Sequence, residues 1–135
     1  MISDELKKYI EQLFKKKKYE ELIKVAGKFI KSNERPPGLA SLLGTCKILK
    51  KSRSKEDVLS ALGYFEEAYL KGKKTIHGIS GISNLISISL INVYTQKEFL
   101  PFILKAEKYY LESEKYFEKN ADFLKVGLDL FIYQM

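Results

Sequence analysis

Apolar residues recur at steps of three and four along most of the chain, the spacing that lines one face of an α-helix. The pattern runs over 6–14, with Ser3 as a cap, and resumes over 19–30 after a run of lysines. Pro36, Pro37 and Gly38 then end one element and start another. The spacing therefore predicts three helices in the first part of the chain, the second ending near Ser32 and the third covering 39–49.

The second half continues the same pattern. A polar loop over 50–55 leads to Ser54 and Asp57, which resemble a capping box, and the helix that follows is predicted to end at Gly72. Residues 82–90 partly alternate, as a strand would, but no second strand exists to pair with them, so a long helix is predicted. Pro101 opens another helix to about Lys119, and Asn120 or Asp122 caps a final one. The fold class is all-α, with about seven helices.

The predicted helices alternate between two patterns of small and apolar residues, one for the first helix of each pair and one for the second. Second helices of each pair carry Leu22, Ala26 and Phe29; Ala61, Phe65 and Ala68; and Ala106, Tyr110 and Ser113. First helices carry Ala40, Leu43, Gly44 and Lys47; Ile79, Ile82, Ser83 and Ile86; and Phe123, Val126, Gly127 and Leu130. This arrangement resembles the tetratricopeptide repeat (TPR) family, whose first helices follow W-x-x-L-G-x-x-Y and whose second helices follow A-x-x-x-F-x-x-A. Lys47 departs from it, because the family has an aromatic residue there.

The resemblance implies one domain over 1–135, in which antiparallel helix pairs stack as a TPR-like α-solenoid. The units would cover 3–36, 37–75 and 76–119, with a terminal helix over 120–135. In that family the first helices line a groove that takes a peptide, so the chain would be a non-enzymatic scaffold or adaptor for a protein or peptide. Carried over, the groove residues are Lys7, Glu11, Phe14, Ser41, Thr45, His77, Ser80, Asn84 and Ser87.

The last four of these residues form a polar stripe at steps of three and four on a helix otherwise rich in Ile and Leu. Such a stripe can hydrogen-bond a peptide backbone. In the alternative interpretation, its Ser and Asn side chains bond the carbonyls of the preceding turn or meet water. The family's carboxylate clamp is not carried over, because Glu11 lies one turn from Lys7 and would oppose an anionic ligand.

The terminal helix is apolar nearly all round, whereas the end of a repeat array normally shows water a polar face. Three explanations stay open: the helix docks back on the molecule, it pairs with another copy, or the natural chain continues beyond Met135. Its apolar residues are Phe123, Leu124, Leu128, Leu130, Phe131, Ile132 and Tyr133.

Charge is divided unevenly. The chain has a net charge of +7, and residues 1–74 hold 18 Lys and Arg against 10 Asp and Glu, whereas residues 75–135 hold 6 against 7. A basic half of this kind attracts phosphates, so the alternative function is binding of nucleic acid or another polyanion. The candidate patch comprises Lys15, Lys16, Lys17, Lys18, Lys50, Lys51, Arg53 and Lys55.

Catalytic and metal chemistry find little support in the composition. One His and one Cys exclude a centre built from several of either, and Cys46 has no partner for an intrachain disulfide, which favours a reducing, cytoplasmic location. A catalytic Cys46–His77 pair would form only if the fold happened to bring these two distant residues together. The sequence also contains no phosphate-binding glycine loop. We expect no enzyme activity, no cofactor and no metal.

The chain is also not expected to span or enter a membrane. The opening residues are acidic where a secretory signal needs a basic region. Residues 75–96 contain no charged side chain and are long enough to cross a bilayer. They also contain many Ser and Asn residues, which would be costly in hydrocarbon, so a helix buried in protein is predicted.

Overall fold

The structure, a computed structural model, describes residues 2–93 and 95–134, and the side chains of all of these except Gln134. The described residues form seven α-helices and two short 3₁₀ turns, and they contain no strand, so the all-α prediction is confirmed. The helices are α1 (Asp4–Lys15), α2 (Tyr19–Phe29), α3 (Pro37–Leu49), α4 (Lys55–Lys71), α5 (Ile76–Val93), α6 (Leu100–Phe117) and α7 (Ala121–Gln134). The 3₁₀ turns cover Ser32–Glu34 and Lys97–Phe99.

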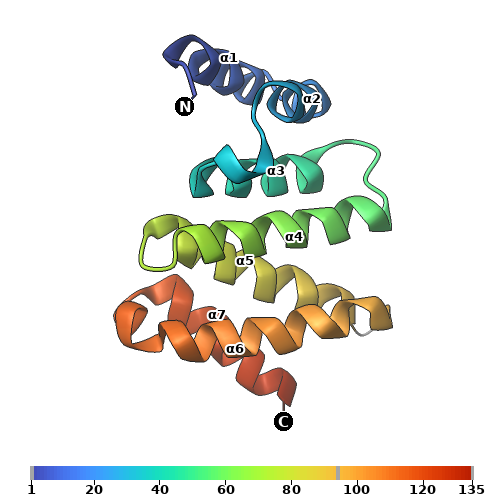
Figure 1. Cartoon of the computed structure of the whole chain (residues 1–135). Coiled ribbons are helices and arrows are strands. Elements are labelled where there is room, and N and C mark those ends of the chain that lie inside the picture. The colour runs from blue at the N-terminus through green and yellow to red at the C-terminus, as the bar shows by residue number, and fades with distance from the viewer. Residues whose placement is uncertain (1, 94, 135) are drawn as a thin grey trace.

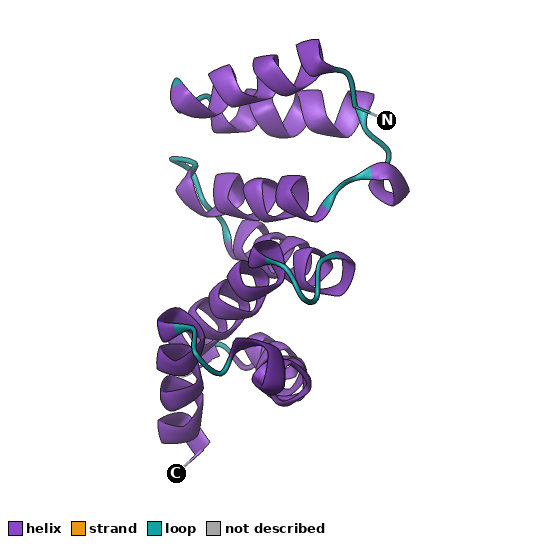
Figure 2. Ribbon diagram, turned by 90° about the vertical axis from the view of Figure 1, so that its left-hand side faces the viewer, coloured by secondary structure: helices purple, strands orange, loops and turns teal. Residues whose placement is uncertain are grey.

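The helices follow one another along a single direction, with α1 and α2 at one end and α6 and α7 at the other (Figure 1). A view from the side shows the same order and places the two termini at opposite ends (Figure 2). Each helix packs against the next in sequence, and α5 also contacts α3 and α7. The helices are therefore not closed around a shared central axis, and α5 has the most neighbours.

Most of the helix boundaries follow the local signals in the sequence. The Ser3 hydroxyl accepts a hydrogen bond from the Leu6 N–H at 3.2 Å, and Ser54 with Asp57 forms the predicted capping box. Gly72 ends α4, and residues 82–90 are helical as predicted. Asn120 rather than Asp122 caps α7, because its side-chain oxygen accepts from the Phe123 N–H at 3.0 Å.

Two boundaries differ from the predictions. The second helix ends at Phe29 and not near Ser32, because Ile30 adopts an extended conformation that buries its side chain against the first three helices. Helix α6 ends at Phe117, two residues before the predicted Lys119. Because α2 ends earlier than predicted, the chain leaves the helix at Ile30 and passes through the 3₁₀ turn Ser32–Glu34 into α3.

The apolar side chains form two clusters. The smaller one joins α1, α2 and α3, and includes Leu13, Leu22 and Cys46. The larger one joins α4, α5, α6 and α7, with Phe65 and Tyr69 among its most buried members. Burial of this apolar surface is the main force that holds the helices together.

Helix α5 is, among the described helices, the one that is long and apolar enough to cross a membrane by length and composition. In this structure its apolar residues meet protein on several sides, and Ile82, Leu85 and Ile86 are completely buried. Contacts with α3, α4, α6 and α7 cover part of its surface, so the prediction of a buried helix holds for the residues between Gly78 and Ser89. Ile76 and Ile91, near its two ends, are exposed.

Close approach of α4 and α5 depends on Gly81. A Cβ atom at this position would lie 2.5 Å from the carbonyl oxygen of Phe65 and 3.0 Å from the amide nitrogen of Tyr69. Both atoms belong to the α4 backbone, which cannot move as a side chain can. The two helix axes must therefore separate if any larger residue occupies position 81.

We expect Gly81→Ala to destabilise the protein by about 1–3 kcal/mol, the usual cost of an overpacked core. The matched control is Gly63→Ala, because Gly63 is exposed on α4 and a Cβ there meets nothing within 4 Å. Since alanine is the better helix former, the control should stabilise by about 0.5–1 kcal/mol. Urea unfolding of both variants checks the pair, and equal effects would contradict this account of the α4–α5 contact.

Candidate functional site

A pocket of about 460 Å³ opens between α5 and the start of α7. Its lining residues are Ile76, Ile79, Ser80, Ser83, Asn84, Ser87, Asn120, Asp122, Lys125 and Val126. Three members of the predicted polar stripe, Ser80, Asn84 and Ser87, are among them. We call this pocket the α5–α7 groove.

Hydrogen bonds connect the stripe to α3. The hydroxyl oxygens of Ser41 and Ser80 lie 3.4 Å apart, and Asn84 Nδ2 donates to Ser80 Oγ at 3.3 Å. Thr45 behaves differently, since its hydroxyl donates to the backbone carbonyl of Ser41 at 3.0 Å. The structure thus connects Ser41, Ser80 and Asn84 through side-chain contacts. Thr45 instead bonds a carbonyl of the preceding helical turn, as the alternative interpretation of the polar residues predicts.

Ser83 is the most unusual polar residue of the groove. Its hydroxyl oxygen is buried and has no hydrogen-bond partner among the described residues. Elsewhere on α5, Ser89 and Asn92 donate to the carbonyls of Leu85 and Ile88 at 2.5 and 2.7 Å. A buried hydroxyl without a partner costs free energy, and a ligand in the groove that hydrogen-bonds Ser83 would remove that cost.

The remaining predicted groove residues lie outside this pocket. The exposed His77 ring lies against Gly38 at the start of α3, where an added Cβ would be 3.0 Å from the ring. Lys7 and Glu11 are exposed on α1. Phe14 is half-buried and packs edge to face on Tyr19, with ring centroids 5.8 Å apart. The structure therefore assembles the α3 and α5 members of the set and does not bring the three α1 residues to them.

Sequence reasoning missed seven residues of the groove: the apolar Ile76, Ile79 and Val126, and the polar or charged Ser83, Asn120, Asp122 and Lys125. In the sequence pattern Ser83 occupies the position of a small packing residue, and Asn120 and Asp122 are candidate helix caps. Asn120 does serve as the cap of α7. One signal in the sequence could have indicated Asn120 and Asp122. If the helix pairs stack as predicted, the start of α7 lies beside α5, so residues that cap α7 lie next to the polar stripe.

The two lysine runs of the candidate polyanion patch come together at one end of the first two helix pairs. Lys17 and Lys18, in the turn between α1 and α2, share a pocket of about 630 Å³ with Lys50 and Lys51, which follow α3. Tyr19, Glu20, Glu21, Leu49 and Ser52 complete its lining. The acidic members of the lining offset part of the positive charge.

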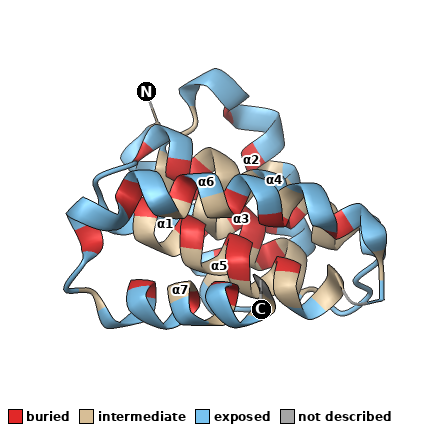
Figure 3. Ribbon diagram, turned by 90° about the horizontal axis from the view of Figure 1, so that it is seen from below, coloured by how far each residue is buried: buried red, intermediate tan, exposed pale blue. Residues whose placement is uncertain are grey.

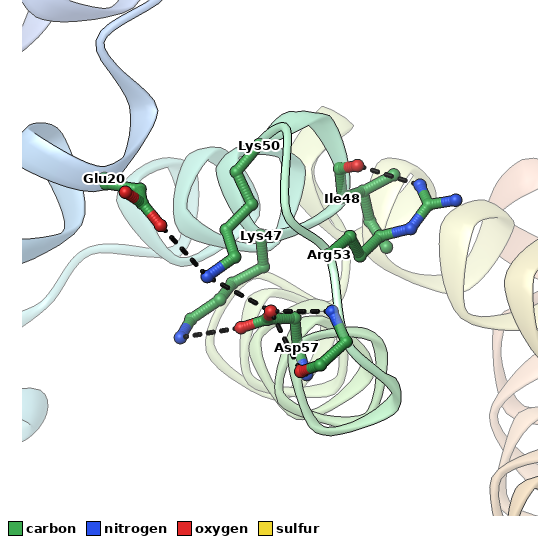
Figure 4. A network of polar contacts seen from close by, with 7 residues as sticks. Glu20, Lys47, Ile48, Lys50, Arg53 and Asp57 are labelled. Carbon is green, nitrogen blue, oxygen red and sulfur yellow. Dashed lines mark hydrogen bonds and ion pairs between the residues drawn. The ribbon is translucent and has the colours of Figure 1, made fainter.

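Three of the basic residues in the predicted patch have partners within the protein, and Figure 4 shows the partners of Lys50 and Arg53. Lys50 Nζ lies 3.3 Å from Glu20 Oε1 and 3.1 Å from Asp57 Oδ2. Arg53 donates to the carbonyl of Ile48 at 2.8 Å, and Lys55 pairs with Glu98 at 3.0 Å. The other five are exposed and have no ion pair within the described structure: Lys15, Lys16, Lys17, Lys18 and Lys51.

Asp57 holds the loop between α3 and α4 in place. Its carboxylate accepts from the Ser54 N–H at 2.9 Å and pairs with Lys50, and Lys47 Nζ lies 3.7 Å away. The hydrogen bond from the Ser54 backbone, helped by Lys50, lowers the pKa of Asp57 from its ordinary 3.8 to about 2. The folded protein therefore favours the ionised carboxylate.

Nucleophilic and metal-binding groups are sparse. Burial raises the pKa of the Cys46 thiol to about 12, so it stays protonated at neutral pH. Cys46 is buried in the smaller cluster, whereas His77 is exposed at the start of α5. Within residues 2–93 and 95–134, no group of three or more His, Cys, Asp or Glu side chains could hold a metal ion.

In comparisons with known proteins, no family model matches the chain, and neither a curated protein nor a solved structure matches it. The resemblance to the TPR family therefore rests on the residue pattern given above.

We expect Asp57→Asn to lower the melting temperature at pH 7, because it weakens both the capping box and the pairing with Lys50. A depressed pKa contributes stability that is present above about pH 4 and is lost as the pH falls toward 2. The difference between the two proteins should therefore shrink over that interval in thermal unfolding followed by circular dichroism. Glu56→Gln removes a charge from the same helical turn without removing the cap. A difference for Asp57→Asn that stays constant down to pH 2 would contradict the assignment.

Proposed function

We propose that this chain is a TPR-like α-solenoid that binds an extended peptide segment of another protein in the α5–α7 groove, without catalysing a reaction. The arrangement of contacts supports this proposal. Helices α1 and α2, α3 and α4, and α5 and α6 pack as successive pairs, and α5 contacts both α3 and α7. Helices α3 and α5 begin at Pro37 and Ile76, where the second and third units are predicted to begin.

The observation that carries the proposal is the composition of the groove. Apolar Ile76, Ile79 and Val126 lie beside the hydroxyls and amides of the stripe in one pocket. Binding sites for peptides combine apolar contact, which supplies affinity, with a few placed polar groups that fix register. This groove contains both kinds of group.

Two polar atoms are available to a peptide backbone. The Asn84 amide donates to Ser80, which leaves its carbonyl oxygen to accept a backbone N–H. The Ser83 hydroxyl lies in the groove wall, is buried and has no partner among the described residues, and rotation of its side chain would let it donate to a backbone C=O. Together these atoms match the alternating donors and acceptors of an extended chain.

The test is selection of random short peptides on the immobilised chain, followed by calorimetry of the enriched sequences. Because each lost hydrogen bond costs about 0.5–1.5 kcal/mol, Ser83→Ala combined with Asn84→Ala should weaken binding by about tenfold. Ser83→Ala alone should keep or raise the melting temperature, since it removes an unpaired buried hydroxyl. Asn92→Ala is the matched control, because Asn92 lies on the same helix beyond the groove.

Two results would refute the peptide proposal. One is the absence of any sequence enriched above background. The other is enriched peptides that bind the double variant and Asn92→Ala equally well.

A second candidate function is binding of single-stranded nucleic acid at the lysine-rich end. The shared pocket of Lys17, Lys18, Lys50 and Lys51 favours it, because lysines from two separate runs converge there. Backbone phosphates would meet the exposed lysines, and affinity would come from release of counterions. The partial neutralisation of Lys50 by Glu20 and Asp57 limits this field.

For this candidate we expect Lys17→Glu, Lys18→Glu and Lys51→Glu together to abolish binding of a fluorescent oligonucleotide at low salt. The wild-type affinity should fall with salt, with a log–log slope of about −0.7 per phosphate contacted. Lys24→Glu, Lys28→Glu and Lys31→Glu make the same charge change away from the pocket, and should weaken binding less. Equal losses in the two triple variants, measured by anisotropy, would show a diffuse charge effect and no site.

A further inference from the structure

Helix α7 has an exposed apolar surface. Leu124, Leu128, Phe131 and Ile132 are 49–60% exposed, and their spacing places them on one face of the helix. The opposite face of α7 is buried through Phe123, Val126 and Leu130. Figure 3, which looks at the molecule from below, shows the buried residues of α7 toward the other helices and exposed residues on its outer side.

Helix α6 widens this surface. Leu111 is 62% exposed and lines a pocket together with Leu124 of α7. We call Leu111, Leu124, Leu128, Phe131 and Ile132 the α7 face. A contiguous apolar surface of this kind marks an interaction site in soluble proteins.

The other end of the protein has a different character. The exposed residues of α1 and α2 include Tyr9 and Phe29, but most of them are charged or polar. They include Asp4, Glu5, Lys7, Lys8, Glu11, Gln12, Lys15, Glu20, Glu21, Lys24 and Lys28. The α1–α2 end therefore has a polar surface that suits water, and the α7 end does not.

We propose that the α7 face binds a second copy of the chain, with the two α7 helices antiparallel around a two-fold axis. The exposed apolar residues of α7 run from Leu124 to Ile132, so their midpoint is Leu128. In an antiparallel pair centred there, Leu128 meets Leu128 of the second copy and Leu124 meets its Ile132. This contact uses Leu124, Leu128, Phe131 and Ile132, none of which lines the α5–α7 groove, so the two proposed sites consist of different residues.

Charge favours a second copy in this orientation. Residues 100–134 hold five lysines against six Asp and Glu, so each end has a net charge of only −1 and the repulsion between two such ends is small. The basic half, 18 Lys and Arg against 10 Asp and Glu, lies toward the far end of each copy. Pairing through α7 keeps these like charges far apart, whereas contact through the other end would bring them together. Antiparallel helices also place opposite ends of their dipoles side by side.

The available area is adequate for a dimer. Five large apolar side chains that are roughly half exposed offer about 450 Å² on each copy. With the polar rim that accompanies an apolar interface core, the total approaches the roughly 1,600 Å² of a standard interface. We therefore expect a reversible dimer.

The test is sedimentation equilibrium of the 135-residue chain over micromolar to millimolar concentrations. We expect a monomer–dimer equilibrium for the wild type. Leu128→Lys and Leu128→Glu should each be monomeric, because the two-fold axis places like charges opposite each other. An equimolar mixture of the two variants should form a heterodimer, since opposite charges then meet across the axis.

Two controls separate this proposal from unfolding and from the peptide site. Leu49→Lys changes a residue with similar exposure on α3 and should leave the dimer intact. Asn84→Ala should also leave it intact. A wild-type monomer at all concentrations, a dimer unaffected by Leu128→Lys, or equal dissociation by Leu49→Lys would each overturn the proposal, as would failure of the mixed variants to associate. Circular dichroism of the variants confirms that the exposed substitutions retain the helical fold.

Discussion

The close packing of α5 against its neighbours is the interaction on which the rest of the structure depends. Gly81 lets the α4 backbone approach to a distance that a Cβ atom would prevent, and Ile82, Leu85 and Ile86 are fully buried. Helix α5 also contacts α3, α6 and α7, so it connects the two halves of the array. The side of α5 that faces the start of α7 carries Ser80, Ser83, Asn84 and Ser87.

The two long sides of the array satisfy their polar groups differently. Between α4 and α6, Tyr69 donates to Glu112 at 3.0 Å, Ser113 donates to Tyr69 at 3.2 Å, and Tyr109 donates to Glu66. This network links α4 to α6, and burial is the main cause of the raised pKa of Tyr69. On the side formed by α5 and α7, Ser83 has no partner among the described residues. The α5–α7 side therefore contains a polar atom that the described part of the protein leaves unsatisfied.

Sequence periodicity predicts the helices well because each helix depends on local spacing and local caps. Residues 82–90 alternate partly as a strand would, but a strand needs a partner strand, and the sequence predicts none. A helix is therefore expected there, and the structure has one. The candidate site is less predictable. Periodicity indicates which face of a helix is polar, but the placement of one pair relative to the next comes from side-chain packing. Lys7 and Glu11 therefore share a pattern with Ser80 without sharing its pocket. Ser83 resembles a packing residue until its missing hydrogen bond is seen.

The lysine-rich end shows why a count of charges overstates its strength. The sequence places Lys50 and Lys55 in a basic patch. In the folded protein, however, these lysines form ion pairs with Asp57 and Glu98, so part of their charge is already neutralised. Asp57 also caps α4, so the carboxylate that neutralises Lys50 cannot leave without weakening the helix start. A polyanion would have to compete with these internal partners at the α3–α4 loop. The exposed lysines before α2 face no such competition, so any phosphate binding at this end must rely chiefly on them.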